Sequence, residues 1–125
     1  MNGVSEKQIA YAMSIRADAA NQIESYRSRY MESKSFKGKN LFAIYNAGRE
    51  LILSYTEAKD VIDNAYNVVK EVLTFANLYE RHCIYCEQHG QKKHAAAYCL
   101  KHAAPGTANC RYLTPEMIEL KLNDV

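Results

Sequence analysis

The sequence EAKDVIDNAYNVVKEVLTFANLYER, residues 57–81, decides the fold class of this 125-residue chain. Its small and apolar residues recur every three or four positions, at Ala58, Val61, Ile62, Ala65, Val68, Val69, Val72, Leu73, Ala76 and Tyr79. That spacing places them along one face of an α-helix. The valines lower the helix propensity slightly, but the regular period outweighs them. We therefore predict a helix over residues 57–81, with Thr56 as its cap.

The residues that follow this helix, 82–110, contain every cysteine and every histidine of the chain. Cys83 and Cys86 form a C-x2-C pair, and Cys99 and His102 form a C-x2-H pair. Two pairs of ligands separated by about a dozen residues are typical of a zinc site. A tight turn would present the first pair. A short helix over residues 94–104 would present the second pair, because positions three apart share a helix face.

The expected zinc ligands are therefore Cys83, Cys86, Cys99 and His102, with Cys110 as an alternative fourth ligand. His82, His89 and His94 are weaker candidates for the fourth position. The arrangement resembles the treble-clef or zinc-finger plan. Residues 81–112 contain few large apolar side chains, so zinc would replace the missing core of this small module. Other interpretations of the cysteines are buried free thiols, disulfides, which need an oxidising compartment, and an iron–sulfur cluster, which normally takes four thiolates.

Two more helices are predicted before residue 57. Ser5 to Gln8 form a capping box, and helical spacing continues from there, so we expect a helix over residues 5–32. Asn40 is a suitable N-cap for a helix over residues 41–55. Gly48 either weakens that helix or permits close packing against another. No breaker separates it from the helix at 57–81, so the two are also compatible with one bent helix.

The opening of the first helix, SEKQIAYAMSIR at residues 5–16, resembles a short segment that recurs in small phage and mobile-element proteins. Some of those proteins carry zinc-binding pairs further along the chain. The resemblance implies a phage-type accessory protein and carries no assigned activity.

The end of the chain has its own helix signal, Thr114 as cap and Pro115 in the first position. We expect a C-terminal helix within residues 113–125 that packs on the rest. The predicted fold is thus mostly α: a helical bundle or long-helix hairpin over residues 1–80, then the zinc-stabilised module, then this helix.

Basic side chains are concentrated in two places, although the net charge of +2 does not by itself indicate a nucleic-acid binder. The segment Ser33 to Lys39 is polar and basic, and would either contact phosphates or serve as a solvated connector. In residues 81–112 the only acidic side chain is Glu87. The candidate phosphate-binding residues are Arg27, Arg29, Lys34, Lys37, Lys39, Lys92, Lys93, Lys101 and Arg111. The nearby Tyr85, Tyr98 and Tyr112 would either stack on bases or be packing residues.

We therefore expect an accessory protein that binds zinc and uses its basic module to bind nucleic acid, DNA or RNA. The alternative is a protein-binding adaptor or inhibitor of a host factor that acts through its helical surface, and a second copy of the chain is also a candidate partner. A closed zinc site has no open position for substrate, and common catalytic motifs are absent, so an enzyme is not expected. No apolar run approaches the ~18 residues of a membrane span, and residues 1–8 lack the core of a signal peptide. A cytoplasmic protein without a membrane partner is expected.

Overall fold

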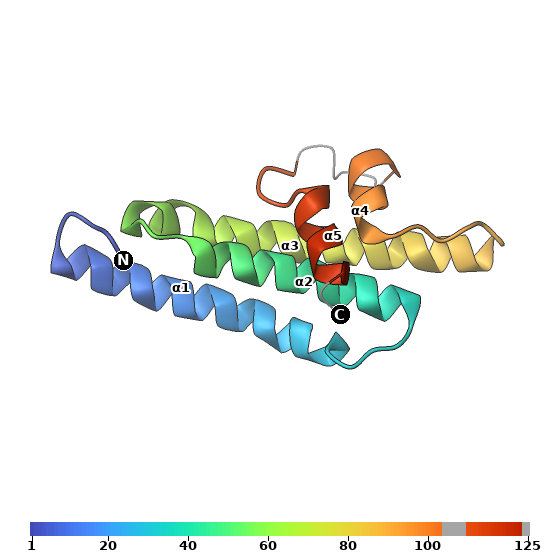
Figure 1. Cartoon of the computed structure of the whole chain (residues 1–125), viewed down its shortest axis with the longest axis horizontal. Coiled ribbons are helices and arrows are strands. Elements are labelled where there is room, and N and C mark those ends of the chain that lie inside the picture. The colour runs from blue at the N-terminus through green and yellow to red at the C-terminus, as the bar shows by residue number, and fades with distance from the viewer. Residues whose placement is uncertain (104–109, 124–125) are drawn as a thin grey trace.

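The computed structural model describes residues 1–103 and 110–123 of the chain. Three long helices pack side by side into an elongated bundle (Figure 1). They are α1 (Glu6–Arg27), α2 (Phe36–Ser54) and α3 (Ala58–Gln88). The shorter elements are η1 (Ser28–Tyr30), α4 (Ala96–Tyr98), η2 (Cys99–Ala103) and α5 (Pro115–Asn123). The mostly α class and the helical bundle are confirmed.

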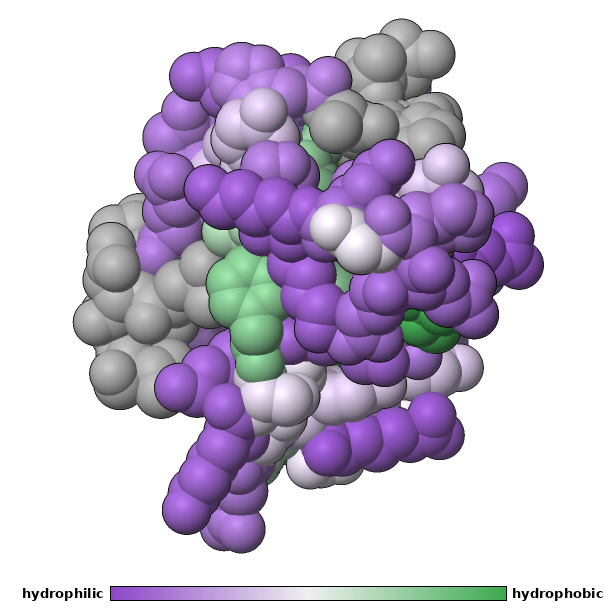
Figure 2. Space-filling view, turned by 90° about the vertical axis from the view of Figure 1, so that its right-hand side faces the viewer, coloured by the Kyte–Doolittle hydropathy of each residue, from purple (hydrophilic) through white to green (hydrophobic). Residues whose placement is uncertain are grey.

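The three long helices alternate in direction, because short connections join them (Figure 1). The end of α3 and the start of α2 therefore lie at the same end of the bundle. Seen from that end, the surface is mostly hydrophilic, with isolated hydrophobic side chains (Figure 2). The short helices α4 and α5 lie together on one side of α2 and α3.

The first helix begins where the sequence predicted. The Ser5 side chain accepts a hydrogen bond from Gln8 N at 3.1 Å, and Gln8 Oε1 accepts one from Val4 N at 2.7 Å. Both bonds satisfy backbone donors near the helix start. The α-helix ends at Arg27 and the backbone tightens into η1, so α1 is shorter than the predicted 5–32.

The second helix begins earlier than predicted, at Phe36. Its N-cap is Ser35, whose side chain accepts from Gly38 N at 3.0 Å. Asn40 as N-cap was wrong, because this residue is 2% exposed inside the helix and donates to Phe36 O at 2.8 Å. Half of the basic segment 33–39 is therefore helical rather than a loop.

The helices α2 and α3 are separate, so one bent helix is excluded. Tyr55 and Glu57 have extended backbone angles. Asn2 bridges the gap: its N–H donates to Thr56 O at 2.8 Å, and its carbonyl accepts from Ala58 N at 2.6 Å. The N-cap position falls on Glu57 rather than Thr56.

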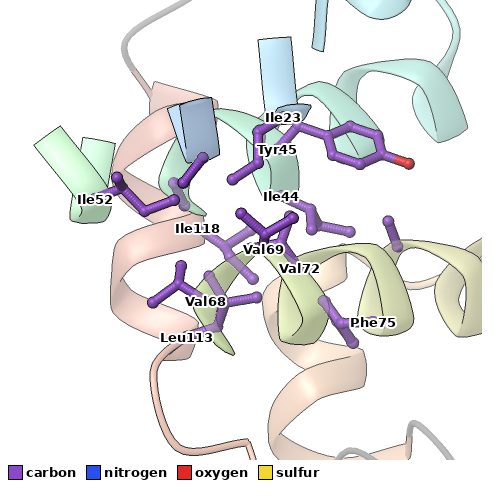
Figure 3. Packing of buried hydrophobic residues seen from close by; sticks show 14 of the residues in the cluster. Ile23, Ile44, Tyr45, Ile52, Val68, Val69, Val72, Phe75, Leu113 and Ile118 are labelled. Atoms are coloured by element: carbon purple, nitrogen blue, oxygen red, sulfur yellow. The ribbon is translucent and has the colours of Figure 1, made fainter. Parts of the chain in front are cut away.

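The core lies where α1, α2 and α3 meet and α5 covers them (Figure 3). Its largest aliphatic and aromatic members include Ile23, Ile44, Ile52, Val68, Val72, Phe75 and Ile118. A Cβ on Gly48 would lie 2.2 Å from Val72 Cγ2. Close packing of α2 on α3 is therefore the reason for a glycine here.

The C-terminal helix starts as predicted. Thr114 Oγ1 accepts from Met117 N at 3.3 Å, and Pro115 occupies the first helical position. The preceding backbone is held by α3: the Glu71 carboxylate accepts from the N–H groups of Arg111, Tyr112 and Leu113 at 2.6, 2.8 and 2.7 Å. This carboxylate fixes where α5 can dock.

Candidate metal centre and the basic end of the bundle

The predicted turn at Cys83 and Cys86 was wrong, because α3 continues to Gln88. The residues between 81 and 88 include no helix breaker, so nothing stops the helix before Gly90, which has a φ of +64°. A glycine in this left-handed region commonly terminates a helix. Both cysteines therefore project from a rigid helix, and the first half of the site differs from a treble-clef knuckle.

Two buried polar side chains bring the second half of the site onto the bundle. Asn40 Oδ1 accepts from Ala96 N at 2.7 Å, at the start of α4. The Tyr79 hydroxyl donates to His94 O at 3.1 Å. These two contacts hold the chain against the bundle after it reverses direction beyond the end of α3. Cys99 follows shortly afterwards, at the start of η2.

Three cysteines and one histidine meet at this place. The exposed fractions of Cys83, Cys86 and Cys99 are only 3%, 2% and 0%, and all three are free thiols. The His82 ring lies between two of them. Its Nδ1 is 4.0 Å from Cys86 Sγ and 3.9 Å from Cys99 Sγ.

Burial raises the pKa of two of these thiols, Cys83 and Cys99. It raises the pKa of Cys99 to about 11, and the neighbouring Cys86 and Cys83 add to the effect. Burial also raises the pKa of Cys83, although a hydrogen bond with the Tyr79 hydroxyl opposes it. Among the described residues, no three His, Cys, Asp or Glu side chains stand in this conformation as a complete metal-binding group.

The other two predicted ligands lie elsewhere. His102 is exposed, and its ring packs on Tyr98 with centroids 4.7 Å apart. Residues 99–103 form a π-helical turn, so positions three apart diverge more than in an α-helix. Burial raises the pKa of Cys110 to about 11, and the neighbouring Glu71 carboxylate adds to the effect. Glu71 precedes Cys83 by about 18 Å of helical rise.

The sequence analysis placed Cys83, Cys86 and Cys99 in its preferred ligand set and His82 only among the weaker candidates for the fourth ligand. The signal was available in the spacing, because His82 and Cys86 are four apart and share a face once the segment is helical. The assumed turn concealed it.

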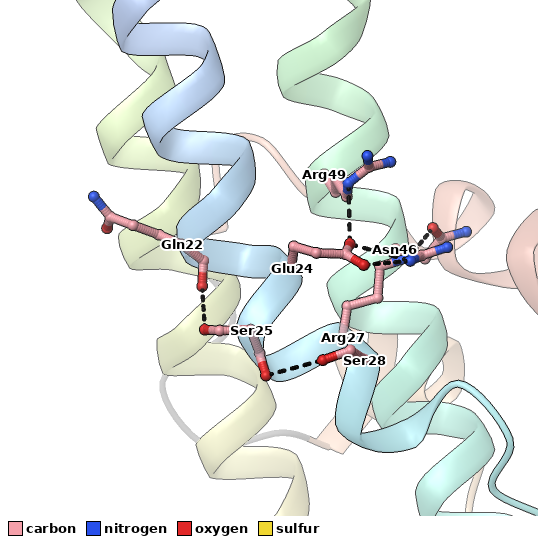
Figure 4. A network of polar contacts seen from close by, with 7 residues as sticks. All are labelled: Gln22, Glu24, Ser25, Arg27, Ser28, Asn46 and Arg49. Carbon is pink, nitrogen blue, oxygen red and sulfur yellow. Dashed lines mark hydrogen bonds and ion pairs between the residues drawn. The ribbon is translucent and has the colours of Figure 1, made fainter.

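Arg27, a candidate phosphate contact, serves the fold instead (Figure 4). Its Nε donates to Asn46 Oδ1 at 2.8 Å, and its guanidinium pairs with Glu24 at 3.1 Å. The guanidinium also lies 5.0 Å from the Phe42 ring centroid. Glu24 pairs in addition with Arg49 at 3.2 Å. These contacts join α1 to α2 and leave Arg27 little freedom to contact a partner.

The remaining basic candidates divide by location. Lys37 on α2 and Lys93 after α3 are close enough to Cys83 to lower its pKa, and Lys93 forms an ion pair with Glu87. Arg111 lies instead near the middle of α3, beside Glu71. The exposed members are Arg29, Lys34, Lys39, Lys92, Lys101 and Arg111.

Two tyrosines of the predicted module are exposed and stacked against histidines. Tyr85 is 48% exposed, with its ring 4.0 Å from that of His89. Tyr98 is 45% exposed, with its ring 4.3 Å from that of His94. Tyr112 differs, because its hydroxyl donates to Asn64 Oδ1 at 3.0 Å and the ring packs on the core.

A concavity of about 450 Å³ adjoins the Tyr85–His89 stack. Its described lining consists of Leu78, Arg81, His82 and Tyr85, which occupy one face of α3. An apolar floor beside a guanidinium and an exposed aromatic ring suits a planar, partly polar group. The concavity reaches the cysteine cluster through His82.

Fold and site together define a small three-helix bundle with a cysteine–histidine cluster and a basic, aromatic surface at one end. Comparisons of the chain with models of protein families, with curated proteins and with solved structures found no match. None of the described helices combines the length and the apolar character needed to cross a membrane. The assignment of a function therefore rests on the residues of the chain itself.

Proposed function

We propose that this chain is an accessory protein that binds single-stranded nucleic acid at the end of the bundle where α3 ends and α2 begins. The observation that carries the proposal is the pair of exposed tyrosines, Tyr85 and Tyr98, each stacked against a histidine. Proteins that bind single strands combine such aromatic faces with basic side chains that follow the backbone. No catalytic step is part of the proposal.

The charges near these tyrosines support the same partner. Lys92 and Lys101 are exposed, and Arg81 lines the concavity beside Tyr85. The ion pair with Lys93 neutralises Glu87, the acidic residue closest to this surface in sequence. A phosphate backbone therefore meets a net positive surface, and binding should weaken as salt rises because counterions are released.

The experiment is fluorescence anisotropy with a labelled mixed-sequence single strand and the matching duplex, at low and physiological salt. Stacking contributes about 1–3 kcal/mol per base. Tyr85→Ala and Tyr98→Ala should therefore each weaken single-strand binding by roughly 5- to 150-fold. Lys92→Glu and Lys101→Glu should weaken it and reduce its salt dependence.

The matched control is Tyr11→Ala, because Tyr11 is 60% exposed on α1. That variant should bind like the unchanged protein. The proposal fails if no strand binds at low salt, or if Tyr11→Ala weakens binding as much as Tyr85→Ala.

A protein-binding adaptor is the second candidate, supported by exposed apolar side chains along the bundle. Tyr11, Met13, Leu53 and Tyr66 are 60%, 48%, 41% and 44% exposed. Helical surfaces of this kind suit a partner helix or a second copy of the chain. Absence of nucleic-acid binding, together with a dimer in analytical ultracentrifugation that Tyr11→Ala disrupts, would favour this candidate.

A further inference from the structure

We propose that His82, Cys83, Cys86 and Cys99 bind one zinc ion, with His82 rather than His102 as the nitrogen ligand. This site stands independently of the nucleic-acid proposal, since a structural metal can hold the fold together whatever partner binds. It differs from the set expected from the sequence in its histidine and in the helix that carries most of its ligands.

The spacing of the donor atoms is the first argument. A tetrahedral zinc ion, with bonds of about 2.3 Å to sulfur and about 2.0 Å to nitrogen, separates neighbouring S and N ligands by about 3.5 Å. His82 Nδ1 lies 4.0 Å from Cys86 Sγ and 3.9 Å from Cys99 Sγ. Both distances exceed the tetrahedral edge by only about half an ångström. The histidine nitrogen and two of the sulfurs are therefore already close to the spacing that a shared zinc ion requires.

The second argument is how the elements present the ligands. On α3, Cys86 follows His82 by four residues and Cys83 by three. Cys86 therefore shares a helix face with both His82 and Cys83. Cys99 approaches from η2, on the other side of the chain reversal. Ligands thus come from two elements whose relative position Asn40 and Tyr79 already fix.

Burial and the surroundings of the sulfurs form the third argument. The three thiols are almost inaccessible to solvent, which suits a closed structural site. Three thiolates, a neutral imidazole and Zn²⁺ leave one net negative charge, and Lys37 and Lys93 lie close enough to offset it.

Thiolate and imidazole ligands favour zinc, and among spectroscopic probes cobalt(II), over magnesium or calcium. The bound ion would join the end of α3 to η2. It would therefore hold the segment between them against the bundle, in addition to the hydrogen bonds already described.

The experiment uses the full chain, reduced and freed of metal with a chelator, then titrated with Co²⁺ and afterwards with Zn²⁺. We expect one Co²⁺ per chain, with a thiolate charge-transfer band and the strong visible bands of a tetrahedral complex. Zn²⁺ should displace it. The proposal is overturned if Co²⁺ does not saturate the protein at one ion per chain. It is also overturned if the cobalt complex lacks the thiolate charge-transfer band.

The variants identify the histidine. His82→Ala should weaken zinc binding at least tenfold and change the visible cobalt spectrum, whereas His102→Ala and Cys110→Ser should leave both unchanged. The reverse result for the two histidines overturns the assignment of His82. Circular dichroism checks folding, and the half-buried His82 lies outside the three-helix core, so its loss should leave helix content intact.

The cysteines are tested in the same way. Cys83→Ser, Cys86→Ser and Cys99→Ser should each lower the intensity of the charge-transfer band relative to Cys110→Ser. If Cys83→Ser leaves the band and the zinc affinity unchanged, the four-ligand set is wrong.

Discussion

The Glu71 carboxylate anchors the backbone that leads into α5, and its removal should release the C-terminal segment. Glu71 lies half-buried on α3 and accepts three backbone N–H groups, from residues 111, 112 and 113, at 2.6–2.8 Å. Leu113 is 3% exposed, so the last of these donors lies at the edge of the core. Glu71→Ala leaves all three donors without this acceptor.

The magnitude follows from the burial of each bond. Hydrogen bonds to charged groups contribute about 1.5–3 kcal/mol each, but an exposed donor regains a bond to water. The Arg111 bond is exposed, whereas those of Tyr112 and Leu113 are partly buried. Because the two partly buried bonds still compete with some water, their contributions are smaller than the full range. Their loss should lower the free energy of unfolding by about 2–4 kcal/mol. That is a large fraction of the roughly 5–15 kcal/mol of a typical domain.

Urea denaturation and amide hydrogen exchange measure the effect together. Glu71→Ala should shift the midpoint to lower urea and remove the protection of amides 111–113 and of α5. Glu71→Gln, which keeps the volume but loses the charge, should cost less. The control is Glu119→Ala, at an exposed position on α5. If Glu71→Ala stays within about 0.5 kcal/mol of the unchanged protein, the range of an ordinary surface substitution, and amides 111–113 stay protected, the reasoning is refuted.

Three further predictions concern the core and its polar anchors. Gly48→Ala places a Cβ 2.2 Å from Val72 Cγ2. Overpacking costs about 1–3 kcal/mol of stability, whereas the better helix propensity of alanine restores up to about 1 kcal/mol. Thermal denaturation should therefore show a net loss of stability. Asn40→Ala leaves the Ala96 N–H without its acceptor and should cost about 1–3 kcal/mol; unchanged exchange of the Ala96 amide would contradict this. Burial raises the pKa of Tyr45 to about 12 from 10.0, so its contribution to stability is present below pH 10 and is lost as the pH rises towards 12. Urea titrations at several pH values should therefore show that the free energy of unfolding falls less between pH 9 and 11.5 in Tyr45→Phe than in the unchanged protein. An equal fall in both proteins would refute the raised pKa of Tyr45.

The local pattern of the sequence was sufficient for the helices themselves. A period of three to four apolar residues identifies a buried helix face regardless of what covers it, and the capping groups of Ser5 and Thr114 act within one turn. Caps were less decisive elsewhere. Both Ser35 and Asn40 are good N-cap types, and only the fold showed that Asn40 is needed inside the bundle as a partner for Ala96.

The candidate metal site shows the same division more sharply. The spacing of the cysteines grouped Cys83, Cys86 and Cys99, because paired ligands are a property of the local chain. The spacing does not determine which histidine faces them. That choice depends on α3 continuing past residue 81 and on the π turn at residues 99–103, which points His102 towards solvent beside Tyr98.

The sequence by itself determined the mostly α class and the approximate helices, and it grouped Cys83, Cys86 and Cys99, since these follow from periodicity and spacing within short segments. Only the tertiary structure decided that His82 lies between Cys86 and Cys99, that Cys110 lies near Glu71 instead, and that Arg27 joins two helices. Contacts between residues distant in the chain depend on how whole helices pack. That packing is fixed by side-chain volume, as at Gly48 and Val72, rather than by any local pattern.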